Sequence, residues 1–223
     1  MSITTSAAIL LGCYLLGSVP FGLVLVRIVT GRDIRSVQSG RTGGTNAMRA
    51  AGFWVGLSTA LLDFFKAAVT VWIVRALGGS LLLEALAPLA AILGHNASVF
   101  LIKRDEQGRL RLSGGAGGAA ALGGAMGLWP GSILIILPIA IILYYFVGYA
   151  SLATLSVSAL AIVIFAVRAI IGTGPWEYVA YGIGTLALLG WALRPNIKRL
   201  LEGTERIHGF RARKNKAAEA ESS

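Results

Sequence analysis

The chain has 223 residues, of which 56% are hydrophobic and only 13% are charged. Soluble domains carry roughly 25% charged residues, so this composition excludes an ordinary soluble protein and predicts one surrounded mostly by lipid. The formal net charge is +10, but the basic residues flank apolar stretches, which indicates membrane orientation rather than nucleic-acid binding. The single cysteine, Cys13, excludes an internal disulfide, and the sequence has no Cys/His spacing typical of a metal site.

Seven apolar stretches predict an all-α integral membrane protein with seven transmembrane helices. A spanning helix needs roughly 20 mostly apolar residues. The fourth stretch is short and glycine-rich and is therefore the weakest prediction, although small residues let membrane helices approach closely. In chain order, the predicted spans cover residues 6–29, 52–74, 81–102, 115–129, 131–147, 151–171 and 177–193.

The placement of Lys and Arg favours seven spans over six. Residues 27–50 hold five of these cations, residues 103–113 hold four, and the segment from residue 194 onward holds eight, which together make 17 of the 20. Cytoplasmic segments of membrane proteins are enriched in Lys and Arg. Seven spans place all three stretches in the cytoplasm, with the N-terminus outside and the C-terminus inside, whereas six would leave the basic tail outside.

Two further regions complete the predicted organisation. The polar segment KRDEQGRLRLS lies between the third and fourth spans, and its EQGR is predicted to turn a small hairpin. Residues 1–206 are predicted to form a single transmembrane domain. Residues 207–223, which are basic and then polar, are predicted to be a disordered cytoplasmic tail.

The stretch SVQSGRTGGTNAMR, residues 36–49, is unusual between two apolar segments. It combines glycines, hydroxyls, an amide and two arginines, and it contains no acid. Glycines allow successive backbone N–H groups to point into one concavity, and arginines bind phosphate through paired hydrogen bonds. The stretch therefore predicts a phosphate site, with a solvated loop of positive-inside arginines as the alternative.

Other candidate groups fall on the same predicted cytoplasmic face. The glycines of residues 113–118 open the fourth span, where free N–H groups at a helix N-terminus favour an anion; close helix packing is the alternative, and it is the preferred interpretation for 123–127. His95 is a candidate general base or phosphate donor, although a lone histidine near a membrane interface is more often structural.

Asp63 and Lys66 lie inside the second predicted span, three residues apart and hence on one helix face. Asp63 falls roughly 17 Å along the helix, near the middle of the bilayer. Charges there are costly and usually pair or line a polar path. We favour a structural ion pair and keep an ion or proton pathway open.

Taken together, these residues resemble the bacterial acyl-phosphate-dependent glycerol-3-phosphate acyltransferase family of small integral membrane proteins. The resemblance extends over nearly the whole chain and rests on the order and spacing of its motifs. These are GSVPFG (17–22), GGTNAMRAAG (43–52), LDFFKA (62–67), GHNASVFL (94–101), GGAGGAAALG (114–123), SLATLSVS (151–158) and RPNIKRLLEGTE (194–205).

The resemblance implies a seven-helix protein of the bacterial inner membrane with its active site on the cytoplasmic face. Its substrates would be acyl phosphate and glycerol 3-phosphate, and its product 1-acyl-glycerol 3-phosphate (lysophosphatidic acid), made for phospholipid synthesis without metal or coenzyme. The expected partners are these substrates and membrane lipid, with no nucleic acid; the oligomeric state is left open.

The motifs also imply site residues. The residues implied to be catalytic are Ser39, Asn46, Arg49 and His95. Those implied to bind substrate or phosphate are Thr45, Asn96, Gly114, Gly115, Gly117, Ser151, Asn196 and Glu205. The residue pattern itself adds Arg41 as a phosphate-binding cation.

The chain departs from the family pattern in its glycine loop, which typically reads GGKG and here reads GGAG, with Ala116 at the lysine position. Alanine supplies no charge for a phosphate. We hypothesise that Arg41, which stands where the family has asparagine, or Arg111 from the polar insertion replaces that lysine. The alternatives are a divergent paralogue with another acceptor or no activity, and a small transporter that uses Asp63 and Lys66.

Overall fold

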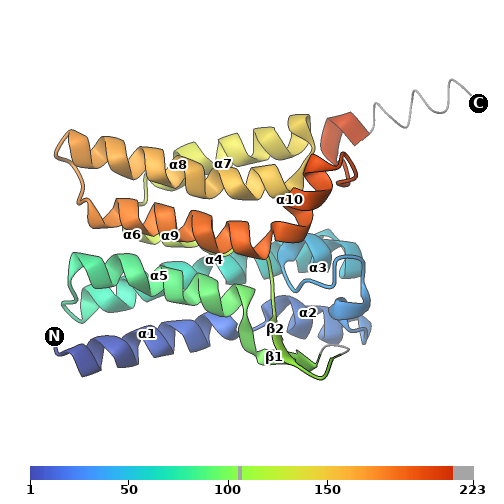
Figure 1. The fold of residues 1–223 in the computed structure, drawn as a ribbon, viewed down its shortest axis with the longest axis horizontal. Helices are drawn as coiled ribbons and strands as arrows, with labels where there is room; N and C mark the ends of the chain where they lie inside the picture. Colours follow the sequence, from blue (N-terminus) through green and yellow to red (C-terminus); the bar gives the residue numbers. More distant parts are fainter. Residues whose placement is uncertain (105–106, 213–223) are drawn as a thin grey trace, which may run out of the picture.

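The computed structural model describes residues 1–104 and 107–212, and the described part is almost entirely helical (Figure 1). The helices are α1 (Ile3–Ser18), α2 (Phe21–Thr30), α3 (Gly44–Ala51), α4 (Phe53–Ala76), α5 (Leu81–Asn96), α6 (Gly118–Leu128), α7 (Ser132–Ile142), α8 (Ala150–Ile170), α9 (Glu177–Ala192) and α10 (Arg194–Leu201). A 3-10 turn, η1 (Ile34–Ser36), a π-helical turn, η2 (Leu143–Val147), and two strands, β1 (Ser98–Arg104) and β2 (Leu110–Ser113), complete the fold.

The long helices have the length and surface expected of a membrane protein. Three helical segments, Ile3–Thr30, Phe53–Ala76 and Ala150–Ile170, are long and apolar enough to cross a bilayer. Large apolar side chains such as Leu134 and Ile170 face outward, at 76% and 71% exposure. Extensive exposed apolar surface marks contact with a membrane or a partner, and together with the spanning helices it indicates an integral membrane protein.

Two of the predicted spans differ from the helices observed. The first, 6–29, is divided into α1 and α2 at Pro20, which has no backbone N–H to continue the helix. The third, predicted to end at residue 102, ends at Asn96, and Ser98 begins β1. Apolar runs such as VFLI fit a strand as well as a helix, so hydropathy alone placed this boundary wrongly.

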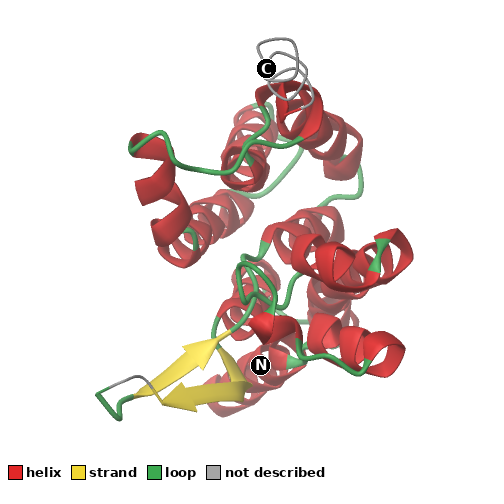
Figure 2. Cartoon of the chain, turned by 90° about the vertical axis from the view of Figure 1, so that its right-hand side faces the viewer, coloured by secondary structure: helices red, strands yellow, loops and turns green. Residues whose placement is uncertain are grey.

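The predicted hairpin is confirmed. β1 and β2 pair antiparallel, with Ile102 opposite Leu112 and Lys103 opposite Arg111. In Figure 2 the two strands project from one side of the helices. Residues 105 and 106, which belong to the connection, lie outside the described part.

The folded structure also continues past the predicted boundary at residue 206. Ile207 forms a bridge with Tyr149, and the backbone N–H of His208 donates to the Gly148 carbonyl oxygen over 2.8 Å. Residues 207–212 are therefore part of the folded protein, because this segment finds backbone partners at the start of α8. Residues 213–223, the rest of the predicted tail, lie outside the described residues.

The glycine-rich helix α6 lies in the centre of the bundle and packs against α4. A Cβ on Gly123 would overlap the backbone carbonyl of Phe64, so only glycine allows this approach. The preferred interpretation of residues 123–127 as packing glycines is therefore confirmed. The main core lies among α4, α5, α6, α8 and α9, with Phe165 and Tyr181 almost fully buried.

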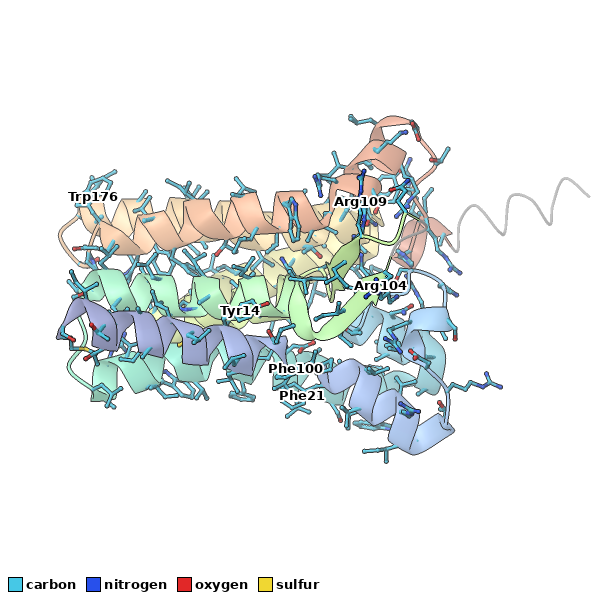
Figure 3. All side chains as sticks on the ribbon, turned by 60° about the horizontal axis from the view of Figure 1, so that its bottom comes forward. Tyr14, Phe21, Phe100, Arg104, Arg109 and Trp176 are labelled. Atoms are coloured by element: carbon cyan, nitrogen blue, oxygen red, sulfur yellow. The ribbon has the colours of Figure 1, made fainter. Side chains whose placement is uncertain are left out.

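The connections rich in Lys and Arg gather at one end of the bundle. Figure 1 shows α3, α10 and the hairpin at the end opposite the N-terminus. Figure 3 places Arg104 and Arg109 toward this end and Trp176 at the other. The described parts of the three basic stretches therefore share one end, as the charge pattern predicts.

Candidate active site

The stretch 36–49 folds into a loop that is held by one buried amide. The Asn46 Nδ2 group donates to the carbonyl oxygens of Ile34, Val37 and Arg41, over 3.2, 3.0 and 2.9 Å. Asn46 is 2% exposed. Because buried backbone carbonyls need a donor, this amide fixes the conformation of the loop in front of α3.

The loop forms one wall of a cavity of about 420 Å³. The other walls come from the glycine loop, the start of α8, α10 and residues 205–208. The lining residues with polar or charged side chains are Gln38, Ser39, Arg41, Thr45, Arg49, Ser151, Thr154, Asn196, Arg199, Glu205, Arg206 and His208. Four of these are arginines and one is an acid, so the described lining is strongly cationic.

Arg41 bonds across the cavity wall to the end of α9 and to α10. Its Nη2 atom donates to the Ala192 carbonyl oxygen over 2.6 Å and to Asn196 Oδ1 over 3.2 Å. Its Nη1 atom is buried and has no hydrogen-bond partner among the described residues. Burial lowers the pKa of the guanidinium, and the neighbouring Arg199 lowers it further. An arginine nevertheless keeps its proton. An anion in the cavity would therefore be stabilised by this buried cation and could accept a hydrogen bond from Nη1.

Arg49 faces the same cavity from the last turn of α3. Burial lowers the pKa of its guanidinium, with a further contribution from Arg206. Its Nη2 atom lies 3.1 Å from Nε2 of His208. Two desolvated guanidinium groups thus face one cavity, which is an arrangement suited to phosphate.

Glu205, the acidic residue of the described cavity lining, is hydrogen-bonded within the protein. Glu205 is buried, and its carboxylate accepts from the Ser151 hydroxyl over 2.6 Å and from the Asn196 amide over 3.0 Å. The Asn196 carbonyl oxygen in turn accepts from Arg41. This chain of bonds ties α8, α10 and the C-terminal segment to the loop, so the three predicted residues act together and orient Arg41.

A smaller hollow of about 170 Å³ continues inward from the cavity. The two share Ser39, Arg41, Thr45, Arg49, Ala116 and Thr154 in their linings. The hollow reaches Asp63 and His95. Lys66 Nζ lies 2.8 Å from Asp63 Oδ1 and 3.0 Å from His95 Nδ1, and all three side chains are buried. Asp63 and Lys66 therefore form a buried ion pair, and His95 bonds to both partners.

The glycine loop is built against α5. The Gly115 N–H donates to the His95 carbonyl oxygen over 2.9 Å, and a Cβ on Gly115 would overlap the His95 ring. Gly117 adopts a φ of +88°, a left-handed conformation favourable to glycine, beside the Asn96 amide. His95 and Asn96 thus shape the glycine loop, and Ala116 is turned toward both cavities.

We expect Gly115→Ala to lower the catalytic activity of this site by at least about tenfold, because the new methyl group would displace the glycine loop from His95 and a displacement of about 1 Å can cost 10²-fold in rate. Gly190→Ala is a matched control, since a Cβ there meets no atom within 4 Å. Steady-state kinetics of the two purified variants checks this, and equal activity would contradict it.

The structure brings most of the predicted site residues together. Those lining the larger cavity are Ser39, Arg41, Thr45, Arg49, Ser151, Asn196 and Glu205. Asn46, His95 and Gly117 line only the smaller hollow. Asn96, Gly114 and Gly115 line neither and lie behind the loop, where Asn96 Nδ2 donates to the Leu188 carbonyl oxygen over 3.3 Å.

Five polar side chains of the larger cavity were not among the predicted site residues: Gln38, Thr154, Arg199, Arg206 and His208. Arg199 lies within the motif RPNIKRLLEGTE and could have been noticed there. Gln38 and Thr154 likewise lie within the stretch 36–49 and the motif SLATLSVS. Arg206 and His208 give no local signal, because only the return of the C-terminal segment onto α8 places them at the cavity.

A family model described as Glycerol-3-phosphate acyltransferase matches residues 7–203. A glycerol-3-phosphate acyltransferase of Thermus thermophilus is 37% identical over 209 residues, covering 94% of this chain and 98% of its own length. The chain belongs to the glycerol-3-phosphate acyltransferase family. A family member from Syntrophomonas wolfei is 36% identical over 199 residues, covering 89% and 95% of the two chains.

The fold of this acyltransferase family member is also similar to solved structures. The integral membrane glycerol 3-phosphate acyltransferase PlsY (YgiH), in its glycerol 3-phosphate form, is 31% identical with a TM-score of 0.77, covering 92% of this chain and 96% of the other. Its lysophosphatidic acid form is 30% identical with a TM-score of 0.75 and the same coverage.

Proposed function

We propose that this chain transfers an acyl group from acyl phosphate to the sn-1 hydroxyl of glycerol 3-phosphate, giving 1-acyl-glycerol 3-phosphate, or lysophosphatidic acid. The observation that carries the proposal is the arginine-walled cavity, in which Arg41 and Arg49 are desolvated. Both substrates carry phosphate, and PlsY was solved in glycerol 3-phosphate and lysophosphatidic acid forms.

In the proposed reaction the hydroxyl oxygen attacks the acyl carbonyl carbon while the hydroxyl proton passes to a base. The bond from that carbon to the phosphate oxygen then breaks, and phosphate leaves with the electron pair. Arg41 and Arg49 would hold the phosphates, and the Ser39 and Thr45 hydroxyls at the cavity wall would donate hydrogen bonds. Donors aimed at the developing oxyanion contribute most to such acyl transfers.

The remaining site residues are proposed to position the groups that bind the substrates. Ser151, Asn196 and Glu205 orient Arg41 through the bonds described above. Asn46 holds the loop, while His95 and Asn96 shape the glycine loop with its residues Gly114, Gly115 and Gly117. The motifs implied a catalytic role for His95 and Asn46. We propose instead that Asn46 positions the loop 36–49 and that His95 positions the glycine loop.

We propose seven membrane crossings in the bacterial inner membrane, with the described residues through 212 as one unit and the acyl-transfer site on the cytoplasmic face. The clustering of α3, the hairpin and α10 at the end opposite the N-terminus supports this orientation. Because the chain has one, buried, cysteine, Lys103→Cys and Ser80→Cys can be labelled separately. An impermeant thiol reagent should label position 80 in intact spheroplasts and position 103 only after lysis.

A second function, acyl transfer to another acceptor, is favoured by Ala116. This side chain faces both cavities where the family pattern has lysine, so the cavity differs from that of its relatives at a contact position. An altered acceptor would still need a hydroxyl and an anionic group for the arginines. The buried ion pair of Asp63 and Lys66, which His95 joins, supports a bracing role.

Purified protein in detergent should form lysophosphatidic acid from palmitoyl phosphate and glycerol 3-phosphate. Palmitoyl coenzyme A as donor tests the acyl-phosphate requirement, and other phosphorylated alcohols as acceptors test the second function. Complementation of a strain that lacks its own glycerol-3-phosphate acyltransferase is the cellular counterpart. Product from another acceptor alone would overturn the first proposal in favour of the second.

A further inference from the structure

The hairpin of β1 and β2 is fixed to the bundle at its base. The Ser98 hydroxyl donates to the Ser18 carbonyl oxygen over 2.6 Å, and the Tyr14 hydroxyl donates to the Ala97 carbonyl oxygen over 2.9 Å. Leu101 of the same strand is buried. These contacts join the start of β1 to α1, so they determine the direction in which the rest of the hairpin leaves the helices.

Beyond this base, the hairpin carries large apolar side chains that the described part of the protein leaves exposed. Phe100, Ile102, Leu110 and Leu112 are 59%, 49%, 66% and 46% exposed. A single exposed apolar residue is ordinary, whereas a group of them on one element marks contact with a membrane or a partner. The hairpin therefore presents a surface that is suited to contact with something outside the bundle.

The register of the hairpin separates its apolar and cationic side chains. Side chains of paired residues share a face, and successive pairs point to opposite faces. The three consecutive pairs are Ile102–Leu112, Lys103–Arg111 and Arg104–Leu110. The first and third pairs, with three apolar side chains and one arginine, therefore share one face, and the two cations of the middle pair lie on the other.

The direction of the hairpin relative to the helices places it along a membrane surface. Figure 2 views the bundle from its basic end, and the hairpin extends sideways from the helices. Figure 3 places Phe100 nearer the middle of the bundle's length, and Arg104 and Arg109 nearer the basic end. Because the long helices cross the bilayer, a hairpin in this direction runs along the leaflet, with Phe100 toward the hydrocarbon and the arginines toward the headgroups.

The charge of the hairpin indicates which lipids it would meet. Its described residues contain no acid and four cations, Lys103, Arg104, Arg109 and Arg111. Residues 105 and 106, the two acids of the connection, lie outside the described part, and the cations outnumber them. An amphipathic element with cations on one face and apolar side chains on the other lies in the interface of an anionic membrane. Long Lys and Arg side chains reach the headgroups from such a position.

We propose that the hairpin docks on the cytoplasmic leaflet and binds anionic phospholipid headgroups. The apolar face enters the interface, and the cations bind lipid phosphates. β1 begins two residues after Asn96, and β2 ends directly before Gly114. Docking would therefore hold both strands that lead into the glycine loop. The inference rests on the membrane crossing of the bundle and does not depend on acyl transfer.

The first test measures the depth of each face in full-length protein reconstituted into vesicles of phosphatidylcholine and phosphatidylglycerol. Cys13 is buried, so Leu110→Cys and Lys103→Cys each accept an environment-sensitive fluorophore at the introduced thiol. The fluorophore at position 110 should emit at shorter wavelength and be quenched by lipids with a nitroxide on the acyl chain. The fluorophore at position 103 should be quenched by a headgroup nitroxide instead.

The second test titrates the phosphatidylglycerol content of the vesicles. Each Lys or Arg near an anionic surface contributes about fivefold to binding, so acyl-chain quenching at position 110 should rise with phosphatidylglycerol. Adding Lys103→Gln/Arg104→Gln should weaken the docking equilibrium by about 30-fold. Arg32→Gln/Lys198→Gln is the matched control, because it removes two exposed cations outside the hairpin, and it should leave the titration unchanged.

Three results would overturn the proposal. The first is equal quenching of both fluorophores by aqueous iodide with no quenching by lipid. The second is a fluorophore at position 110 that neither iodide nor lipid quenches, which would mean that a second copy or another protein covers the face. The third is lipid quenching that does not depend on phosphatidylglycerol, which would remove the anionic headgroup from the assignment.

The readout is independent of catalysis, so a folded but inactive protein would overturn the proposed function and leave the docking result valid. Leu110 and Lys103 are exposed, so both labelled variants should unfold at the wild-type temperature in detergent. If Leu110→Cys unfolds early, Leu112→Cys carries the fluorophore on the same face, and absence of lipid quenching there overturns the proposal.

Discussion

Replacing Arg41 with alanine is expected to lower kcat/KM for glycerol 3-phosphate by about 10- to 150-fold. A hydrogen bond to a charged group contributes about 1.5–3 kcal/mol, and the Arg41 Nη1 atom is buried in the cavity wall without a described partner. The change would also remove the donor to Ala192 and Asn196. Arg32→Ala, which alters an exposed arginine in the connection after α2, should leave the kinetics unchanged.

The same position tests whether Arg41 replaces the lysine of the family pattern. Ala116 borders both cavities together with Arg41, so a lysine there should reach the same phosphate. Ala116→Lys should therefore restore much of the activity that Arg41→Ala loses, and it should have a smaller effect in wild-type protein. Independent, additive effects of the two changes in a double-mutant cycle would contradict the replacement.

Arg111, the other residue considered for this replacement, lies on β2 opposite Lys103. It is not among the described residues that line either cavity. The structure therefore supports Arg41 for the role. Arg111→Ala, measured beside Arg41→Ala with the same substrates, is a direct comparison of the two arginines.

Lys66→Met is expected to destabilise the protein by about 3–5 kcal/mol, because it leaves the buried Asp63 carboxylate without its 2.8 Å partner. Removing both charges in Asp63→Leu/Lys66→Met should recover most of the loss, since replacing a buried ion pair by apolar groups is often nearly neutral. Thermal unfolding of the purified proteins in detergent, followed with a thiol-reactive dye at Cys13, measures both effects.

Lys198→Met is the matched control for this change. Its ion pair with Glu202 is exposed and 3.8 Å long, and surface pairs contribute about 0–1 kcal/mol. If Lys66→Met unfolds at the wild-type temperature, the bracing role is wrong. If it also abolishes ion uptake into vesicles by the wild-type protein, the transport hypothesis gains support.

The sequence by itself determined the membrane class, the family and most of the candidate site. The lengths of apolar runs and the positions of Lys and Arg can be read along the chain. They determine which segments span the bilayer and in which orientation, with little contribution from tertiary contacts. The loop 36–49 likewise indicates a phosphate site through its own glycines, hydroxyls and arginines, because these groups are neighbours along the chain. The motif order then selected the family.

Only the tertiary structure decided which of those residues face the substrate cavity and which hold it in shape. The motifs implied catalytic roles for Asn46 and His95, and only the structure shows that their side chains bond to loop carbonyls and to Lys66. Hydropathy also could not separate strand β1 from helix α5. His208 had no local signal at all, because it reaches Arg49 across 159 positions of the chain, and such a contact depends on how the last segment returns to the bundle.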